Sequence, residues 1–160
     1  MATEPPLPPV IVLRPVIEAD LPVFFDDQRD SDGCGMAGSV PRDQEAFAAH
    51  WAKTLADAAI LTRTILADGH VAGYVASFDR AGQRELGYWV GKAFWKRGVA
   101  TAALGEFLML EERRPLLARV AKRNAASLRV LTKCWFTIVG EDRCTNSGGE
   151  QVEEFVLTLI

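Results

Sequence analysis

The sequence predicts a single α/β domain of the α+β kind, built on a mixed sheet with helices on both faces. Two observations support this prediction. The 160 residues suffice for one sizeable core and are too few for two ordinary domains. Strand-like and helix-like apolar patterns alternate in the order β α α β β β α β α β β, with no repeat or linker between them. We place the domain at residues 10–160, after a flexible lead of residues 1–9.

The first part of the domain predicts one strand and two helices. Residues 10–16 are apolar and β-branched, which is typical of a strand. Asp20 suits a helix N-cap and Pro22 suits its first turn, so a helix follows them. Residues 31–41, SDGCGMAGSVP, are rich in glycine and serine and predict a loop. Residues 42–58 carry large apolar side chains every four positions, which indicates an amphipathic helix.

The middle of the chain predicts three consecutive strands. Residues 60–79 contain two β-branched runs separated by Asp68 and Gly69, which is a strong hairpin signal. A second turn leads to a strand over residues 83–90, whose alternate residues face opposite sides of the sheet. One set is Leu86, Tyr88 and Val90, and the other is Glu85, Gly87 and Trp89.

The last part of the chain predicts two helices and three strands. Residues 101–114 have a helical pattern that ends at Pro115, and residues 116–121 form an apolar strand. Asn124 is a favoured N-cap residue, so a second helix begins there. The two final strands are predicted at residues 136–142 and 152–160.

The composition excludes several classes of protein. The net charge of −3 gives no reason to expect a nucleic-acid partner, and no apolar run reaches the roughly 20 residues of a membrane-spanning helix. The start of the chain, MATEPPLPPV, lacks the basic and apolar regions of a signal peptide. The odd number of cysteines, Cys34, Cys134 and Cys144, suits reduced thiols, and Cys134 lies in an apolar helical pattern like a small core residue. We therefore expect a cytoplasmic protein without a membrane partner.

Several motifs have simpler explanations than a cofactor site. Gly33, Gly35 and Gly38 fit the pattern G-x-G-x-x-G, but they neither follow a buried strand nor open a helix. We therefore favour a mobile loop over a dinucleotide site. No Walker A loop is present, and His50 and His70 make no metal-ligand pairing with the cysteines, so we expect no metal.

A basic cluster follows the middle of the chain. Such a cluster is usually a solvated face, and a site for an anionic ligand is the alternative. Its members are Arg113, Arg114, Arg119, Lys122 and Arg123.

The stretch FWKRGVATAAL, residues 94–104, puts small residues between a predicted strand and a predicted helix. The first turn of a helix has free backbone N–H groups and the positive end of the helix dipole. Small residues such as Gly98 and Ala100 let a phosphate group reach those N–H groups. By itself, the stretch fits an ordinary turn and an anion site equally well.

Two longer segments carry a family resemblance. Residues 85–108 contain the pattern aromatic-x-x-G-x-A-T before a helix, and residues 118–141 contain N-x-x-S followed by L-x-K-C-x-F. Together they resemble the acyl-CoA-binding half of the GNAT N-acetyltransferases, in particular the bacterial-type branch that acetylates the N-termini of ribosomal proteins. The likeness covers nearly the whole chain from Val10. It implies a mostly antiparallel sheet, acetyl-CoA as cosubstrate and transfer of its acetyl group to a primary amine.

The resemblance also implies how acetyl-CoA would be held. Its pantetheine arm would pair with the strand that ends at Trp89 and Val90, and would enter where strands 83–90 and 116–121 splay apart. Asn124 would hydrogen-bond the pantetheine portion. The pyrophosphate would rest on the backbone amides of Arg97, Gly98, Val99, Ala100 and Thr101.

The chemistry of such a family needs a base for the attacking amine and a group that stabilises the departing thiolate. Glu85 is our candidate base, with a solvent-facing strand carboxylate as the alternative. Many relatives have an acidic tyrosine at the position of Leu131, and here the resemblance offers Ser127 to stabilise or protonate the thiolate. The alternative for Ser127 is a helix serine bonded to its own backbone. Lys122 and Arg123 would lie near the emerging CoA phosphate.

Three positions depart from the family pattern. Trp95 and Lys96 stand where a Gln or Arg and then a glycine are usual, and Trp135 replaces the glycine that closes the second helix. A left-handed tryptophan costs on the order of 1 kcal/mol. Either the helix ends differently, or Trp135 fills a space against the substrate side or a second subunit. A non-catalytic acyl-CoA-binding or sensor module, and a structural protein that forms a homodimer, therefore stay open as alternatives.

The amine acceptor is least defined by the sequence. In this fold its specificity would come from residues 29–41 and from the two early helices. Acidic residues near that loop could attract a cationic amine such as a basic peptide N-terminus or a polyamine, and a solvated loop is the alternative. These residues are Asp26, Asp27, Asp30 and Asp32.

Overall fold

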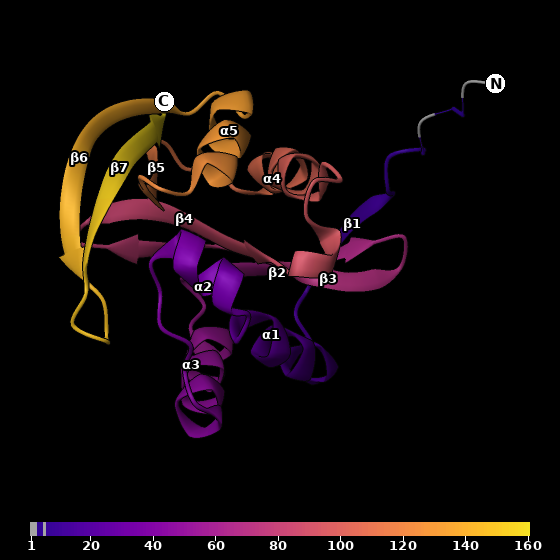
Figure 1. The fold of residues 1–160 in the computed structure, drawn as a ribbon, viewed down its shortest axis with the longest axis horizontal. Coiled ribbons are helices and arrows are strands. Elements are labelled where there is room, and N and C mark those ends of the chain that lie inside the picture. The colour runs from indigo at the N-terminus through magenta and orange to yellow at the C-terminus, as the bar shows by residue number, and fades with distance from the viewer. Residues whose placement is uncertain (1–2, 5) are drawn as a thin grey trace.

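The computed structural model describes residues 3–4 and 6–160 (Figure 1). The helices are α1 (Leu21–Gln28), α2 (Ser31–Ala37), α3 (Gln44–Ala56), α4 (Val99–Leu110) and α5 (Ala125–Lys133). The strands are β1 (Ile11–Arg14), β2 (Leu61–Ala67), β3 (His70–Arg80), β4 (Gln83–Val90), β5 (Leu116–Ala121), β6 (Thr137–Thr145) and β7 (Gln151–Leu159). Single 3-10 turns lie at Glu18–Asp20 and Lys92–Phe94.

The strands form one seven-stranded sheet in the order β1-β2-β3-β4-β5-β7-β6. All neighbouring strands run antiparallel except β4 and β5, which run parallel. The hairpin predicted at Asp68 and Gly69 joins β2 to β3, where Ala67 pairs with His70. The structure thus confirms the α+β class and its mixed, mostly antiparallel sheet.

Helices cover both faces of the sheet, α4 and α5 on one face and α1, α2 and α3 on the other (Figure 1). The larger hydrophobic core lies under α4 and α5 and includes Phe107, Leu131 and Cys134, so Cys134 is the small core residue that its pattern predicts. A smaller core of aromatic rings lies on the opposite face, where Phe24 and Trp51 pack on Tyr74.

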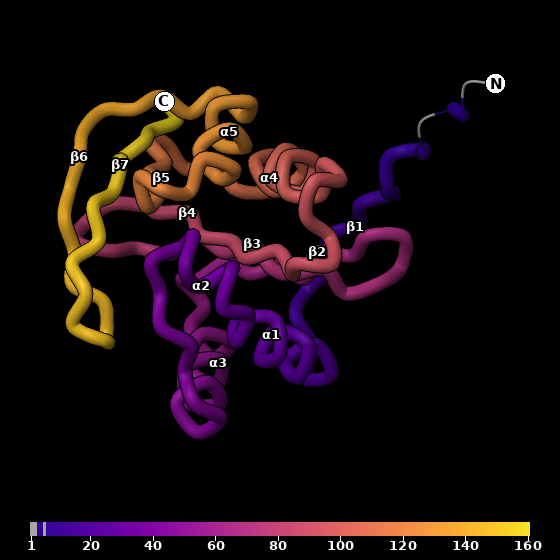
Figure 2. The backbone as a smooth tube through the Cα atoms, viewed as in Figure 1, coloured from indigo at the N-terminus to yellow at the C-terminus, as the bar shows by residue number. Residues whose placement is uncertain are grey.

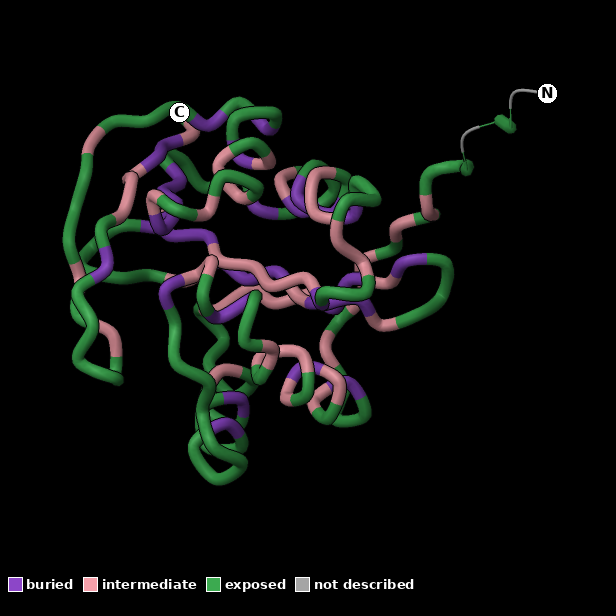
Figure 3. The backbone as a smooth tube through the Cα atoms, viewed as in Figure 1, coloured by how far each residue is buried: buried purple, intermediate pink, exposed green. Residues whose placement is uncertain are grey.

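The β6–β7 hairpin extends from one edge of the sheet and bends toward the side of α1, α2 and α3 (Figure 2). Most of β6 is exposed, as Figure 3 shows in green. The side-chain amide of Asn146 in the hairpin donates to the carbonyl oxygen of Gly38 at 3.2 Å. This bond ties the hairpin to the segment between α2 and α3.

The helix α2 corrects the prediction of a loop over residues 31–41. Asp30 caps the helix, because its carboxylate accepts a hydrogen bond from the amide of Gly33 at 2.8 Å. Gly38 ends it in the left-handed conformation, with φ of 68°, as glycine does after many helices. These two caps offset the low helix propensity of the glycines between them.

The helix α4 ends at Leu110 and not at the predicted Arg114. The next residue, Glu111, leaves the helical conformation and is only 1% exposed. Its carboxylate accepts hydrogen bonds from the Nε atoms of Arg113 at 2.9 Å and of Arg84 at 3.1 Å. The helix therefore ends where Glu111 turns toward these arginines, four residues before Pro115.

Glu111 should make folding stability depend on pH. Burial by itself raises the pKa of Glu111, but hydrogen bonds from Arg113, Ser77 and Arg84 outweigh burial and lower it to about 2. The carboxylate therefore stabilises the fold above its ordinary pKa of 4.5, and this stabilisation is lost as the pH falls from 4.5 toward 2.

We expect Glu111→Gln to lower the free energy of unfolding at neutral pH by about 3 kcal/mol, because it removes the closest charge partner of the buried Arg84. It should also flatten the acid-side loss of stability. Urea denaturation across the acidic pH range measures both effects, with the exposed Glu112→Gln as control. Equal pH dependence in Glu111→Gln and the wild type would contradict this role.

Trp135 adopts the conformation that glycine usually takes at the end of a helix. Its φ is 72°, and the amide of Phe136 donates to the carbonyl of Leu131 at 3.1 Å, which is the Schellman arrangement. The helix α5 thus ends as in the family pattern despite the substitution. The Trp135 side chain is 83% exposed, so packing within the chain offsets little of the conformational cost.

Trp135→Gly should therefore stabilise the isolated chain by about 1 kcal/mol. Trp135→Ala is the matched control, because it removes the ring but keeps the Cβ that causes the strain. Thermal and urea unfolding compare the three proteins. A less stable glycine variant would show that the ring packs against something and that the strain is not the dominant effect.

Candidate active site

The site begins where β4 and β5 separate. The two strands pair at only three places, Arg84 with Leu116, Glu85 with Leu117 and Leu86 with Ala118. Within the described residues their pairing stops there, although β4 continues to Val90 and β5 to Ala121. The splay that the resemblance implies is therefore present as a gap inside the sheet.

The backbone of Tyr88 and Val90 faces this gap. The carbonyl oxygen of Trp89 instead lies against β3, since a Cβ added to Gly73 would be 1.9 Å from it, and the amide of Gly91 also donates to β3 at 2.8 Å. Successive residues of a strand direct their backbone groups to opposite sides. Of the two residues predicted to pair with pantetheine, Val90 offers its backbone to the gap, and a ligand contact by Trp89 stays a prediction.

Two tryptophan side chains contact segments that lie next to the gap. The indole Nε1 of Trp95 donates to the carbonyl oxygen of Val90 at 2.8 Å. The ring of Trp89 lies beside α2, where a Cβ added to Gly33 would be 3.0 Å from it. Trp95, which departs from the family pattern, thus attaches the segment before α4 to the end of β4.

The start of α4 has the form of an anion site. Gly98 is the N-cap, with φ of 75° and no side-chain cap, so the amides of the first turn have no side-chain partner. Lys96 is also left-handed, with φ of 61°, at the position where the family pattern has glycine. The side chain of Val99 is buried in the core, which leaves only its backbone to a ligand. A helix start of this kind binds phosphate groups.

The other residues predicted for the pyrophosphate flank this helix start. The guanidinium of Arg97 lies 3.8 Å from the Asp68 carboxylate and 5.6 Å from the ring centre of Phe94. Ala100 and Thr101 are half-buried in the first turn of α4. The helix start therefore combines free amides with small residues and one nearby cation.

The start of α5 lies on the other side of the gap. Asn124 caps this helix as predicted, since its Oδ1 accepts a hydrogen bond from the Ser127 amide at 3.1 Å. The hydroxyl of Ser127 lies 2.5 Å from the hydroxyl of Tyr88 on β4. Leu131, at the position of the family's tyrosine, is buried in the core.

Tyr88 is a site residue that sequence reasoning missed. Its place among the apolar residues of one strand face made it look like a core residue, and its ring does pack on the larger core. Burial raises the pKa of Tyr88 to about 12, against the opposing effect of its hydrogen bond with Ser127. The phenol is therefore protonated at neutral pH.

Glu85 lies on the opposite face of β4 from Tyr88 and is buried, which rules out the alternative of a solvent-facing carboxylate. Its Oε1 accepts from the Nε of Arg119 at 3.1 Å, and its Oε2 lies 3.7 Å from Arg80. Arg119 also pairs with Asp142 of β6 at 2.7 Å. The structure thus brings Glu85 to the closed end of the gap, with both carboxylate oxygens facing arginines.

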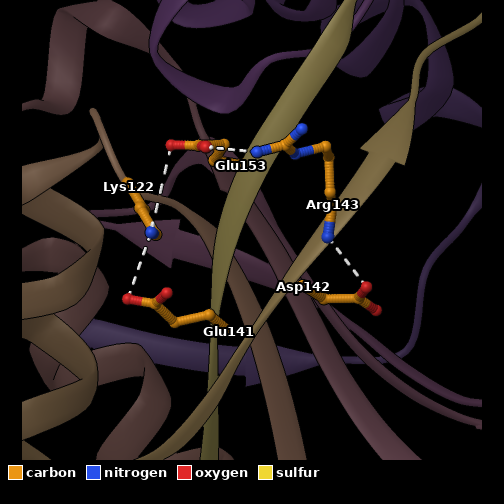
Figure 4. Close-up of a pocket in the computed structure, with 5 residues that line it drawn as sticks. All are labelled: Lys122, Glu141, Asp142, Arg143 and Glu153. Carbon is orange, nitrogen blue, oxygen red and sulfur yellow. Dashed lines mark hydrogen bonds and ion pairs between the residues drawn. The ribbon is translucent and has the colours of Figure 1, made fainter.

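Two members of the basic cluster, Lys122 and Arg123, pair with carboxylates. Lys122 lies 3.1 Å from Glu141 and 3.9 Å from Glu153, and Arg123 lies 3.1 Å from Glu150. Figure 4 shows the shallow pocket of about 260 Å³ beside Lys122, where three carboxylates surround two cations. The place of Lys122 and Arg123 beside a CoA phosphate stays a prediction.

The aspartates of α1 and α2, which are predicted to attract a cationic amine, differ in their contacts. Asp30 caps α2, and Asp32 pairs with Lys92. The carboxylate of Asp27 lies over the backbone of Gly91, since a Cβ added there would be 2.7 Å from its oxygen. Burial, followed by the charges of the neighbouring aspartates, raises the pKa of Asp27 to about 6. The predicted cluster is thus partly structural, and Asp27 reaches the end of β4.

The described residues contain neither a group of metal ligands nor a membrane-spanning helix. Among them, no three His, Cys, Asp or Glu side chains are grouped as a metal ion would require. No helix in this part of the chain has the length and apolar character needed to cross a membrane.

A family model described as an acetyltransferase (GNAT) domain matches residues 11–137. The match spans β1 to the start of β6, and so includes the gap and both helix starts that flank it. The chain belongs to the GNAT family of acetyltransferases.

Solved structures of GNAT proteins share the fold. An acetyltransferase from Bacillus anthracis has a TM-score of 0.80 at 15% identity, over 96% of this chain and 96% of that chain. A spermidine N-acetyltransferase from Vibrio cholerae, in complex with CoA and spermine, has a TM-score of 0.76 at 14% identity, over 92% and 95%. RimJ from Mycobacterium smegmatis, in complex with CoA-disulfide, has a TM-score of 0.75 at 21% identity, over 94% and 82%. A search of curated proteins found no match.

Proposed function

We propose that this GNAT protein is an acetyl-CoA-dependent N-acetyltransferase that transfers the acetyl group to a primary amine in a ternary complex. The observation that carries the proposal is the gap between β4 and β5, which opens beside the uncapped first turn of α4. The acceptor would be a peptide or protein N-terminus, as in the ribosomal-protein branch, or a small amine. We place the enzyme in the cytoplasm of a bacterial-type cell.

The residues around the gap fit acetyl-CoA. The backbone groups of Tyr88 and the amide of Val90 can pair with the amide groups of an extended pantetheine arm, as an added strand would, whereas the carbonyl oxygen of Val90 already accepts from Trp95. Oδ1 of Asn124 accepts from Ser127, which leaves its NH2 group to donate to the same arm. The amides at the start of α4 suit the pyrophosphate because anions bind at helix N-termini.

The proposed chemistry uses two side chains of this chain. Acetyl-CoA supplies the thioester whose carbonyl carbon the amine attacks. Glu85 takes the proton from the amine, and its contacts with Arg119 and Arg80 hold its carboxylate in place at the closed end of the gap. Ser127 donates a hydrogen bond to the departing thiolate from the start of α5, where the helix dipole also favours negative charge.

The acceptor would approach from the side of α1 and α2. Glu85 and Arg119 lie on that face of the sheet, and Asp27 and Asp30 stand near the end of β4. Their negative charge would attract a cationic amine. One neighbour in fold, the spermidine N-acetyltransferase, carries a name consistent with a small cationic amine as acceptor.

Acetyl-CoA binding tests the first half of the proposal. At about 100 times its dissociation constant, acetyl-CoA should add about 2.7 kcal/mol to the stability of the chain, measured as a rise in Tm. Ala100→Asp should weaken binding at least tenfold, because its carboxylate would repel the pyrophosphate although it favours the helix dipole. Ala102→Asp, an exposed position of the same helix, is the matched control. The absence of any shift in the wild type would overturn the proposed function.

Turnover tests the second half of the proposal. A mass-spectrometric screen of amines and peptides with acetyl-CoA identifies an acceptor, and Glu85→Gln should then lower kcat by about 100-fold with little change in acetyl-CoA affinity. Asp142→Asn is the control, because it removes the other partner of Arg119 without changing the gap. An unchanged rate would remove Glu85 as the base. Binding without turnover of any amine would instead favour the acyl-CoA sensor.

A further inference from the structure

A hydrogen bond between the hydroxyl groups of Tyr88 and Ser127 links β4 to α5 beside the gap. Their oxygens lie 2.5 Å apart. Tyr88 is two residues beyond Leu86, the last residue of β4 that pairs with β5, so this contact stands at the point where the gap begins. The Tyr88 ring is held by the larger core, which leaves its hydroxyl little freedom.

We infer that Tyr88 is a positioning residue whose hydroxyl donates to Ser127 and thereby directs the hydroxyl hydrogen of Ser127 into the gap. The inference rests on the proposed function, because it assigns to that hydrogen the stabilisation of the CoA thiolate. It adds Tyr88 to the residues proposed for this step.

The direction of the hydrogen bond follows from acidity and burial. A phenol is a stronger acid than an alcohol, so the favoured arrangement has the Tyr88 O–H as donor and the Ser127 oxygen as acceptor. Because burial raises the pKa of Tyr88 to about 12, the phenol keeps its proton throughout the working range of an enzyme. Ser127 then has one hydrogen left to donate, and Tyr88 need not release a proton at any step.

Among the side chains discussed around Tyr88, Ser127 is the one placed to donate a hydrogen bond to the CoA thiolate. Its amide is held by Asn124, which fixes the first turn of α5. Leu131 supplies no hydroxyl, and the other titratable group that acts on Tyr88 is the thiol of Cys134, the residue that follows α5. Burial raises the pKa of Cys134, so it stays a neutral thiol near neutral pH. A hydroxyl that accepts one hydrogen bond also donates a stronger one, which adds to the effect of Tyr88 on Ser127.

The acidity of bound CoA tests this inference without an acceptor amine. The probe is CoA itself, whose thiolate is titrated by ultraviolet absorbance in complex with the protein, with the protein alone and its desulfo-CoA complex subtracted to remove the cysteines of the chain. A donor at Ser127 should lower the pKa of the bound thiol relative to free CoA. We expect Tyr88→Phe to raise the pKa of the bound thiol by about one, a tenfold loss of acidity.

Two further variants separate positioning from general structure. Ser127→Ala should raise the thiol pKa at least as much, and the double variant should raise it no further, because Tyr88 acts through Ser127. Tyr74→Phe makes the same chemical change at the other tyrosine, in the aromatic core on the opposite face of the sheet, and should leave the thiol pKa unchanged. With an identified acceptor, Tyr88→Phe should lower kcat about tenfold and leave the KM for acetyl-CoA within about twofold.

Each result supports or overturns a stated claim. If the wild type does not bind CoA, the proposed function fails and this inference fails with it. If CoA binds and its thiol has the same pKa in the wild type and in Tyr88→Phe, only the role of Tyr88 is overturned. Additive effects of the two single variants would likewise overturn it, because they would mean that Tyr88 acts independently of Ser127.

Discussion

Three residue pairs between β4 and β5 hold the two parts of the sheet together, and the arrangement around the gap follows from them. Parallel strands cannot be joined by a tight turn, so the chain crosses over through α4, which puts the start of that helix near the end of β4. Beyond those three pairs, the backbone of Tyr88 and the amide of Val90 face a gap instead of a strand, and backbone groups in that position require another partner.

The elements that sequence reasoning predicts well are those defined by local pattern. The β2–β3 hairpin has its Asp68-Gly69 turn, and α5 has its Asn124 cap, so both can be recognised within a few residues. The helix α2 was missed because its glycines suggest a loop, although Asp30 and Gly38 are ordinary caps. The spacing of these two capping residues is the sequence signal that identifies the helix.

The residues of the candidate site also differ in whether a local sequence pattern identifies them. Gly98 was identified because a glycine before a helix start is a local signal, and its left-handed φ agrees with that reasoning. The contact of Glu85 with Arg119 depends on a parallel register between segments 34 residues apart, and no local pattern contains it. Tyr88 was missed because a buried ring and a functional hydroxyl belong to one side chain, and the apolar strand pattern reports only the ring.

The exposed indole of Trp135 makes the fluorescence of the chain sensitive to the surroundings of the end of α5. The indole of Trp135 stands in water at the end of α5, whereas that of Trp51 is enclosed among aromatic rings on the opposite face of the sheet. Tryptophan emission shifts with the polarity around the ring, so the two side chains emit at opposite ends of the usual range. Loosening of the small aromatic core changes the Trp51 signal, and a molecule that covers the end of α5 changes the Trp135 signal. Because Trp89 and Trp95 also emit, a variant without these two rings distinguishes events on the two faces of the sheet without an added label.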